Sequence, residues 1–319
     1  MQSTKALIAA HAPFIHIGTS VEERYWNIFF ASMPSVVFGI LFYGVPALGV
    51  IALSVGSAMG WEVAFKKIAR REPMISDGSS ALFGLLFAML LPATTPWWLI
   101  LIGTFLCIVV GKEIYGGLGC SPVNPVSFAF AIIYLSWKST IDFTGALGNY
   151  EINFFPIEPL SALKFMGVKA ASEFKTTGLL LGQQLGGIGS VFNLGLIAGG
   201  IYLALRRFIK WEISAMFLLS LFITALIFYW VNPEKYANPL FHLLTGYTMI
   251  GAFFLVTEDS TSPVNLIPKL LYGAIAGVMT ILIRNIGAYV DGVIFAILLS
   301  NVFHPLLDKI RPKSFGKGA

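Results

Sequence analysis

The chain has 319 residues, of which 56% are hydrophobic and only 12% are charged. An ordinary soluble domain carries roughly a quarter charged residues, so too little charge remains here to cover a water-facing surface. The net charge of +5 does not indicate a nucleic-acid partner, because the Lys and Arg residues lie in short clusters between apolar runs. The composition predicts an all-α polytopic membrane protein whose surroundings are the lipid bilayer.

The apolar runs predict about ten membrane-spanning helices, each of about 20 residues. The predicted spans cover residues 26–43, 44–63, 78–95, 96–112, 122–137, 188–206, 212–231, 240–257, 270–287 and 290–307. Basic clusters follow the second, the sixth and the last span, and all three fall on one side if both termini are cytoplasmic. The positive-inside rule favours this orientation, so we expect a multi-pass protein of a bacterial or archaeal cytoplasmic (inner) membrane.

The chain divides into two predicted five-helix repeats, residues 1–137 and 188–319, joined by an extracytoplasmic loop over residues 138–187. Residues 110–117 and 282–289 share a basic residue, a polar residue and Ile. Residues 130–136 and 295–300 share Phe-Ala and Leu-Ser. The second set of five spans runs in the opposite sense to the first, and inverted repeats place their functional site near the repeat interface.

Ionisable groups inside spans are costly and are therefore candidates for function. Asp77 opens the third predicted span, where it either caps the helix or belongs to an ion pathway. Ser79 supplies a further oxygen ligand for Na+, and Glu113 a further route for H+, so the sequence leaves the choice of ion open. The pairs Lys112–Glu113 and Arg284–Asp291 lie at predicted membrane boundaries, where charged residues are the ordinary end of a span.

The sequence predicts neither a metal site nor a catalytic group. His242 and His304 are isolated, and the two cysteines have no metal-ligand or disulfide spacing, so no metal site is expected. No residue pattern predicts a catalytic group in this chain.

Residues 112–126 cannot form one regular helix, because they contain several glycines and two prolines. Irregular backbone at membrane depth is tolerated where it is buried in protein or lines a cavity. The freed backbone groups, with Ser121 and Asn124, can bind a polar ring or an ion. A tight turn between two spans is the structural alternative.

Several motifs along the chain resemble a known family. They are Tyr115–Gly119 followed by Asn124-Pro125, Ser76–Ser79 with Leu90–Pro92, Leu244–Gly246 before Gly251–Phe254, and Asp291–Val293 with Phe295–Asn301. In these motifs and their order the chain resembles the D subunit of the Rnf electron-transport complex, and its relative, the B subunit of the sodium-pumping NADH:quinone reductase.

This resemblance implies two inverted five-helix halves, similar to urea transporters. It also implies an activity of the whole complex, in which electrons pass between ferredoxin and NAD and drive Na+ or H+ across the membrane. The implied partners are the other Rnf membrane subunits and the subunits that carry flavin and iron–sulfur centres. A urea-transporter-like channel or carrier without a redox role remains an alternative, as does a structural anchor for redox partners.

The resemblance further implies a flavin. The glycine-rich segment would help to hold riboflavin, and a flavin on the other side would meet the turn between the last two spans, unless that turn is only a capped interfacial turn. The implied cofactor-binding residues are Tyr115, Gly117, Ser121, Asn124, Arg284, Asn285 and Asp291.

Relatives attach FMN covalently to a threonine in the connecting loop, but in this chain Glu158 occupies the matching position. A carboxylate cannot form the phosphoester, and its charge would repel the FMN phosphate. A second partial match, residues 142–147, also lacks the acceptor. We therefore expect riboflavin or noncovalent FMN as the cofactor, without covalent FMN.

Overall fold

The computed structural model describes residues 20–71, 75–141, 143 and 157–310, and within these ranges the regular structure is entirely helical. The first group of helices comprises α1 (Val21–Tyr43), α2 (Val45–Ile68), α3 (Ser79–Leu90), α4 (Trp97–Phe105) continued by the π-helix η2 (Leu106–Glu113), and α5 (Pro125–Ser136). Three short helices follow: α6 (Pro159–Met166), α7 (Val168–Ser172) and α8 (Thr176–Leu181).

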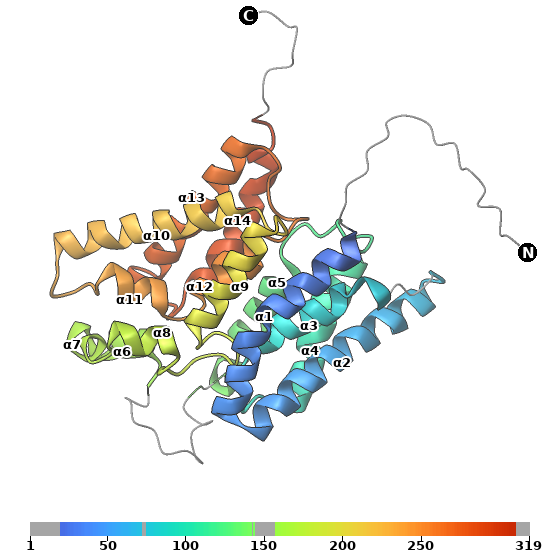
Figure 1. The fold of residues 1–319 in the computed structure, drawn as a ribbon, viewed down its shortest axis with the longest axis horizontal. Helices are drawn as coiled ribbons and strands as arrows, with labels where there is room; N and C mark the ends of the chain where they lie inside the picture. The colour runs from blue at the N-terminus through green and yellow to red at the C-terminus, as the bar shows by residue number, and fades with distance from the viewer. Residues whose placement is uncertain (1–19, 72–74, 142, 144–156, 311–319) are drawn as a thin grey trace, which may run out of the picture.

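The last group comprises α9 (Asn193–Leu205), α10 (Trp211–Val231), α11 (Pro239–Leu244), α12 (Thr248–Ile250) continued by the π-helix η5 (Gly251–Leu255), α13 (Leu266–Asn285) and α14 (Val293–Leu307). Figure 1 shows α1–α5, in blue to green, on one side and α9–α14, in yellow to red, on the other. The helices α6–α8 lie together beside the second group.

Four helices, α1, α2, α10 and α13, are long and apolar enough to cross a membrane. Each of the ten predicted spans overlaps at least one helix, but α3, α5, α9 and α14 are shorter apolar helices. The continuous span predicted over residues 78–95 is wrong, because α3 has only 12 residues. The continuous span predicted over residues 240–257 is wrong as well, because the backbone leaves the helix between Leu244 and Thr248.

A glycine in the left-handed region precedes each of these short helices. Gly78 has φ of 70° before α3, and Gly246 has φ of 64° before α12. This conformation costs other residues steric strain, so glycine lets the chain turn sharply before a new helix starts. A hydropathy window averages over such a turn and cannot detect it.

The two groups of helices meet closely where α1 crosses α9. At Gly199 a Cβ atom would lie 2.1 Å from the backbone oxygen of Ala31, and backbone cannot move aside as a side chain can. The crossing therefore requires glycine at this position.

Replacing Gly199 with alanine is expected to destabilise the protein by about 1–3 kcal/mol, because the added methyl group forces α1 and α9 apart. Thermal unfolding of the fluorescently tagged protein, followed by size-exclusion chromatography after heating, measures the effect. Gly49→Ala in α2 is the matched control, since nothing lies within 4 Å of the Cβ position there. Equal melting temperatures for the two variants would contradict the close crossing.

Candidate functional site

One group of buried charges lies where α2, α3 and η2 meet. Glu62 comes from α2, and two serines come from the start of α3. Lys112 and Glu113 come from the end of η2. We call the following six residues the Lys112 cluster: Glu62, Lys66, Ser79, Ser80, Lys112 and Glu113.

The ammonium group of Lys112 lies at the centre of this cluster. Its Nζ donates to Ser79 Oγ at 2.7 Å and to Ser80 Oγ at 3.2 Å. It lies 3.3 Å from Glu62 Oε1 and 3.6 Å from Glu113 Oε1. The side chain of Lys112 is 1% exposed and that of Glu62 is 0% exposed. Each charge is therefore balanced inside the protein and not by solvent.

Glu62 and Glu113 differ in their partners. Glu62 also accepts from Lys66 and from Ser80, whereas both carboxylate oxygens of Glu113 are buried without a hydrogen-bond partner among the described residues. Buried carboxylates without donors are rare, because the desolvation of the charge is not compensated. Glu113 is therefore the exceptional member of the cluster.

Lys112 and Glu113 are both buried, so neither side chain faces water or lipid at the end of its predicted span. The glycine-rich segment that follows turns back, with positive φ at Gly116 and Gly117. Helix α5 then packs against η2, where a Cβ atom at Gly111 would lie 3.0 Å from Pro125. The end of η2 is thus covered by α5, the helix that follows it in the chain.

Asp77 contacts this cluster from outside α3. Its Oδ1 accepts from the Ser79 amide and from Ser79 Oγ, both at 3.0 Å, as a capping carboxylate does, while Gly78 takes the N-cap position. The structure thus brings Asp77, Ser79 and Glu113 to one place. Sequence reasoning missed Glu62, although a carboxylate inside a predicted span was a signal that could have found it.

A second group of buried charges surrounds Arg284 at the end of α13. Its Nη1 donates to the backbone oxygen of His242 at 2.7 Å. Its Nη2 donates to Thr248 Oγ1 at 2.9 Å and to the Thr245 oxygen at 3.2 Å. Nε and Nη2 both donate to Asp291 Oδ1, at 3.1 and 2.9 Å. We call these five residues the Arg284 cluster.

Asp291 joins this cluster to two helix starts. Its Oδ1 accepts from the Val293 amide at 3.0 Å, and its Oδ2 accepts from the Tyr247 amide at 2.7 Å. Arg284 and Asp291 are therefore occupied by protein groups. Their neighbour Asn285 keeps a buried side-chain amide without a hydrogen-bond partner among the described residues.

The glycine-rich segment has the irregular backbone that its composition predicts. Gly116, Gly117 and Gly119 have φ of 123°, 98° and 85°. Tyr115 at its start is 53% exposed, whereas Ser121 near its end is buried. The segment therefore runs from the surface into the protein.

Asn124 connects the two groups of helices. Its Nδ2 donates to the Leu255 oxygen at 2.9 Å, and its Oδ1 accepts from the Ser127 amide at 2.9 Å. Its backbone amide donates to Asn301 Oδ1 at 2.9 Å. These bonds give Asn124 a structural role in this conformation.

The predicted cofactor-binding residues do not form one site. Asn301, the partner of Asn124, lies eight residues along α14 from Val293, the partner of Asp291, which is a rise of about 12 Å. The cavity beside Asn124 has a volume of about 30 Å³, which is room for one or two water molecules. A flavin ring does not fit there within this chain.

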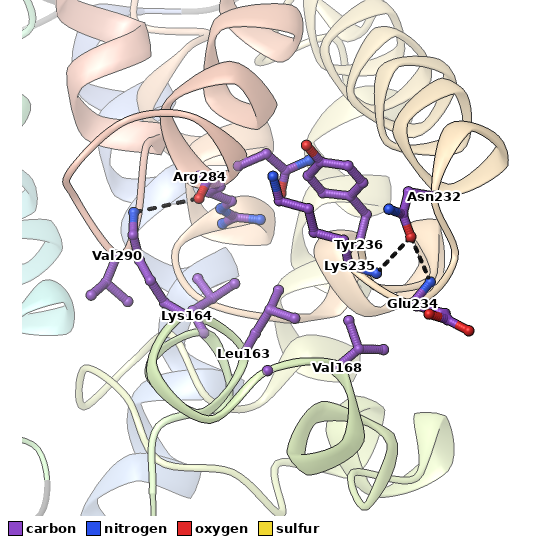
Figure 2. A pocket seen from close by; sticks show the side chains of 12 residues that line it. Leu163, Lys164, Val168, Asn232, Glu234, Lys235, Tyr236, Arg284 and Val290 are labelled. Atoms are coloured by element: carbon purple, nitrogen blue, oxygen red, sulfur yellow. Dashed lines mark hydrogen bonds between the residues drawn. The ribbon is translucent and has the colours of Figure 1, made fainter.

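A larger cleft lies beside the Arg284 cluster. It has a volume of about 560 Å³ between α6, the connection after α10 and the end of α13. Figure 2 shows Lys164 and Val290 on one side, and Lys235, Tyr236 and Asn232 facing them. We call it the loop cleft, and its lining residues are Leu160, Leu163, Lys164, Gly167, Val168, Asn232, Glu234, Lys235, Tyr236, Arg284, Asn285 and Val290.

The two lysines of the loop cleft differ in their surroundings. Lys164 Nζ donates to the backbone oxygens of Gly287, at 2.7 Å, and Tyr289, and its burial lowers its pKa. Lys235 Nζ lies 5.4 Å from the centre of the Tyr236 ring. Lys164 therefore holds the turn after α13, and Lys235 is the cation available to a ligand.

Glu158 is the N-cap residue of α6, and its Oε2 accepts from Ser161 Oγ at 2.6 Å. It borders a separate cavity of about 180 Å³, together with Tyr134, Lys138 and Val290. The pKa of Glu158 is raised to about 7. Burial is the main cause and Asp291 adds to it, whereas the Ser161 hydrogen bond and Arg284 act in the opposite direction. Residues 142 and 144–147 of the second partial match lie outside the described residues.

A sequence profile of the NQR2, RnfD, RnfE family matches residues 8–316. The chain belongs to this family. It is similar to the D subunits of the ion-translocating oxidoreductase complexes of Cronobacter sakazakii and Aeromonas salmonicida, each 32% identical, and of Yersinia enterocolitica, 33% identical. The alignments cover 96% of this chain and 97–98% of each relative, which confirms the family that the motifs indicate.

Proposed function

We propose that this chain is a membrane component of an Rnf-type ferredoxin:NAD oxidoreductase complex, where it binds a flavin and couples electron transfer to Na+ or H+ translocation. Relatives named as the D subunits of ion-translocating oxidoreductase complexes support this, since they align along nearly their whole length. The partners are then the other membrane subunits and those carrying flavin and iron–sulfur centres. The chain acts within the complex, in the cytoplasmic membrane, with both termini cytoplasmic.

Matching contacts support two inverted halves with about ten spans. Lys112 and Arg284 take the same place in the similar segments 110–117 and 282–289. Lys112 donates to Ser80, and Arg284 donates to Thr248. Each of these hydroxyls follows a left-handed glycine by two residues at the start of a short helix. The same arrangement of cation, hydroxyl and glycine thus occurs once in each half.

The loop cleft is the observation that favours a flavin bound without a covalent bond. Its volume of about 560 Å³ lies within the range of small-molecule sites, about 300–1,000 Å³. Lys235 offers a cation for a phosphate group and Tyr236 offers an aromatic ring, and Asn285 also lines the cleft. A cation and an aromatic ring are groups that can bind the phosphate and the ring system of a flavin nucleotide. A bound flavin supplies one- and two-electron transfer, and these residues would bind and orient it.

Lys235→Glu is expected to weaken FMN binding by about tenfold or more, because it replaces the phosphate's cation with an anion. FMN titrated into the purified protein, with quenching of flavin fluorescence as the readout, measures the affinity. Released flavin after denaturation, and no fluorescent band at the mass of this chain in a denaturing gel, are expected for the wild type.

Lys175→Glu is the matched control, because Lys175 is exposed at the start of α8 and does not line the loop cleft. A fluorescent band at the mass of this chain would show covalent attachment and reject the noncovalent site. Equal FMN affinity in the Lys235 variant and the control would reject the loop cleft as its location.

A further inference from the structure

The Lys112 ammonium lies among oxygen atoms as a small bound cation would. Four side-chain oxygens surround Nζ at 2.7–3.6 Å, two from serine hydroxyls and two from carboxylates. Oxygen ligands of this kind are those that hard metal cations prefer. The site lies at the start of the short helix α3, and coupling-ion sites in transporters are commonly built at such interrupted helices.

The charges of the cluster favour a monovalent occupant. Glu62 and Glu113 carry two negative charges, and Lys66 and Lys112 carry two positive charges, so the charges of the six cluster residues balance. The further carboxylate Asp77, which accepts from Ser79 Oγ at the edge of the cluster, is partly exposed, so solvent screens its charge. Without the Lys112 charge, one negative charge is left. A single monovalent cation restores neutrality, whereas a divalent cation would leave the buried cluster positive, which is costly.

Glu113 gives a second observation, separate from the charge balance, that this site can take a cation. Its side chain is 1% exposed, and neither of its oxygens has a hydrogen-bond partner among the described residues. Its Oε1 nevertheless points to Lys112 Nζ at 3.6 Å, which is too long for a hydrogen bond. A cation closer to Glu113 would satisfy this carboxylate.

The matching position in the other half shows how Lys112 differs from a cation that is held rigidly. Arg284 is held by a rigid guanidinium fork on Asp291, on a hydroxyl and on two backbone oxygens. Arginine holds its partners with a rigid planar fork, whereas lysine carries a compact charge on a flexible stem. Several bonds thus fix the cation of one half, whereas the flexible stem of Lys112 allows the ammonium of the other half to move.

We infer that the Lys112 cluster is a binding site for an alkali cation, and that the Lys112 ammonium is a tethered competitor that occupies this site until the cation displaces it. On displacement the ammonium moves away from these oxygens, so one positive charge replaces another. The cation then contacts Glu62, Glu113, Ser79 and Ser80. This inference rests on the proposed ion-coupling function and names its site.

The test uses the purified whole complex, with equilibrium binding of 22Na+ and competition by KCl as the direct readout. Lys112→Met removes the competitor and is expected to increase Na+ affinity by about tenfold or more. Lys112→Arg replaces the ammonium with a rigid guanidinium fork that bonds several oxygens at once, and it is expected to decrease the affinity by a similar factor. Glu113→Gln, which keeps the Lys112–Glu62 pair, is expected to weaken binding as well.

Lys269→Met is the matched control, because Lys269 forms a separate ion pair with Glu212, at 3.5 Å. Equal 22Na+ affinity in the wild type, both Lys112 variants and the Glu113 variant would overturn the site. Binding of neither Na+ nor K+ by any of them would overturn it too. Size-exclusion chromatography selects the variants that fold. If Lys112→Met does not fold, the 22Na+ affinity of either Lys112→Arg or Glu113→Gln decides the question.

Reconstituted vesicles separate this inference from the proposed function. Ferredoxin-driven NAD reduction is measured together with 22Na+ uptake and with a pH-sensitive dye inside the vesicles. A wild-type complex that transfers electrons but moves neither Na+ nor H+ contradicts the proposed function. A wild-type complex that moves ions, with Na+ binding unaffected by the variants, contradicts only the Lys112 site.

Discussion

Replacing Arg284 with methionine is expected to destabilise the protein by about 3–5 kcal/mol, because it leaves the Asp291 carboxylate without its buried cation. The side chains of Arg284 and Asp291 are 1% and 9% exposed, so water cannot take over the lost contacts. The backbone oxygens of His242 and Thr245 would lose their donor as well. Thermal unfolding of the tagged protein measures the change.

Arg24→Met is the matched control for this prediction. Arg24 pairs with Asp259, but their side chains are 29% and 39% exposed, and surface pairs contribute about 0–1 kcal/mol. A double variant, Arg284→Met with Asp291→Asn, is expected to recover part of the loss, because no unpaired charge then remains and the side-chain oxygen of asparagine still accepts from a backbone amide. Similar melting temperatures for Arg284→Met and Arg24→Met would show that the Arg284 cluster does not stabilise the fold.

Hydropathy alone could locate the helices but not their interruptions. The predicted spans at residues 26–43 and 212–231 correspond to α1 and α10, since a long apolar helix has the same signal in sequence and in structure. The interruption at Gly246 depends on one positive φ and on the Asp291 carboxylate that bonds the next amide. Asp291 is 45 residues away in the sequence, so no local window contains this information.

The site residues show a similar division. Ser79 and Glu113 could be chosen because polar groups inside apolar runs are unusual. Their burial around Lys112 could not be predicted from the sequence, because it requires α2 to bring Glu62 beside η2. Charged residues at the end of a span look the same in sequence whether the next segment leaves the protein or folds back over them.

Glu158 is expected to make the stability of this protein depend on pH between about 4.5 and 7. Its pKa is raised to about 7 in the folded protein, so in this range the folded state keeps a proton that the unfolded state releases. Stability contributed by this group is fully present below about pH 4.5 and is lost as the pH rises to about 7. The loss is about 2 kcal/mol, after allowing for partial exposure of the side chain.

Glu158→Gln removes this dependence, because the amide does not titrate and still accepts the hydrogen bond from Ser161. The variant is expected to equal the wild type near pH 4 and to exceed it in stability by about 2 kcal/mol near pH 8. Thermal unfolding across this pH range measures the difference, with Glu173→Gln, at an exposed position after α7, as the matched control. Parallel pH profiles for the wild type and Glu158→Gln would mean that the carboxyl is ionised without cost in the folded protein. A carboxyl that stays protonated up to neutral pH also carries no charge to repel a phosphate, so the same profile decides whether Glu158 opposes an anionic ligand beside α6.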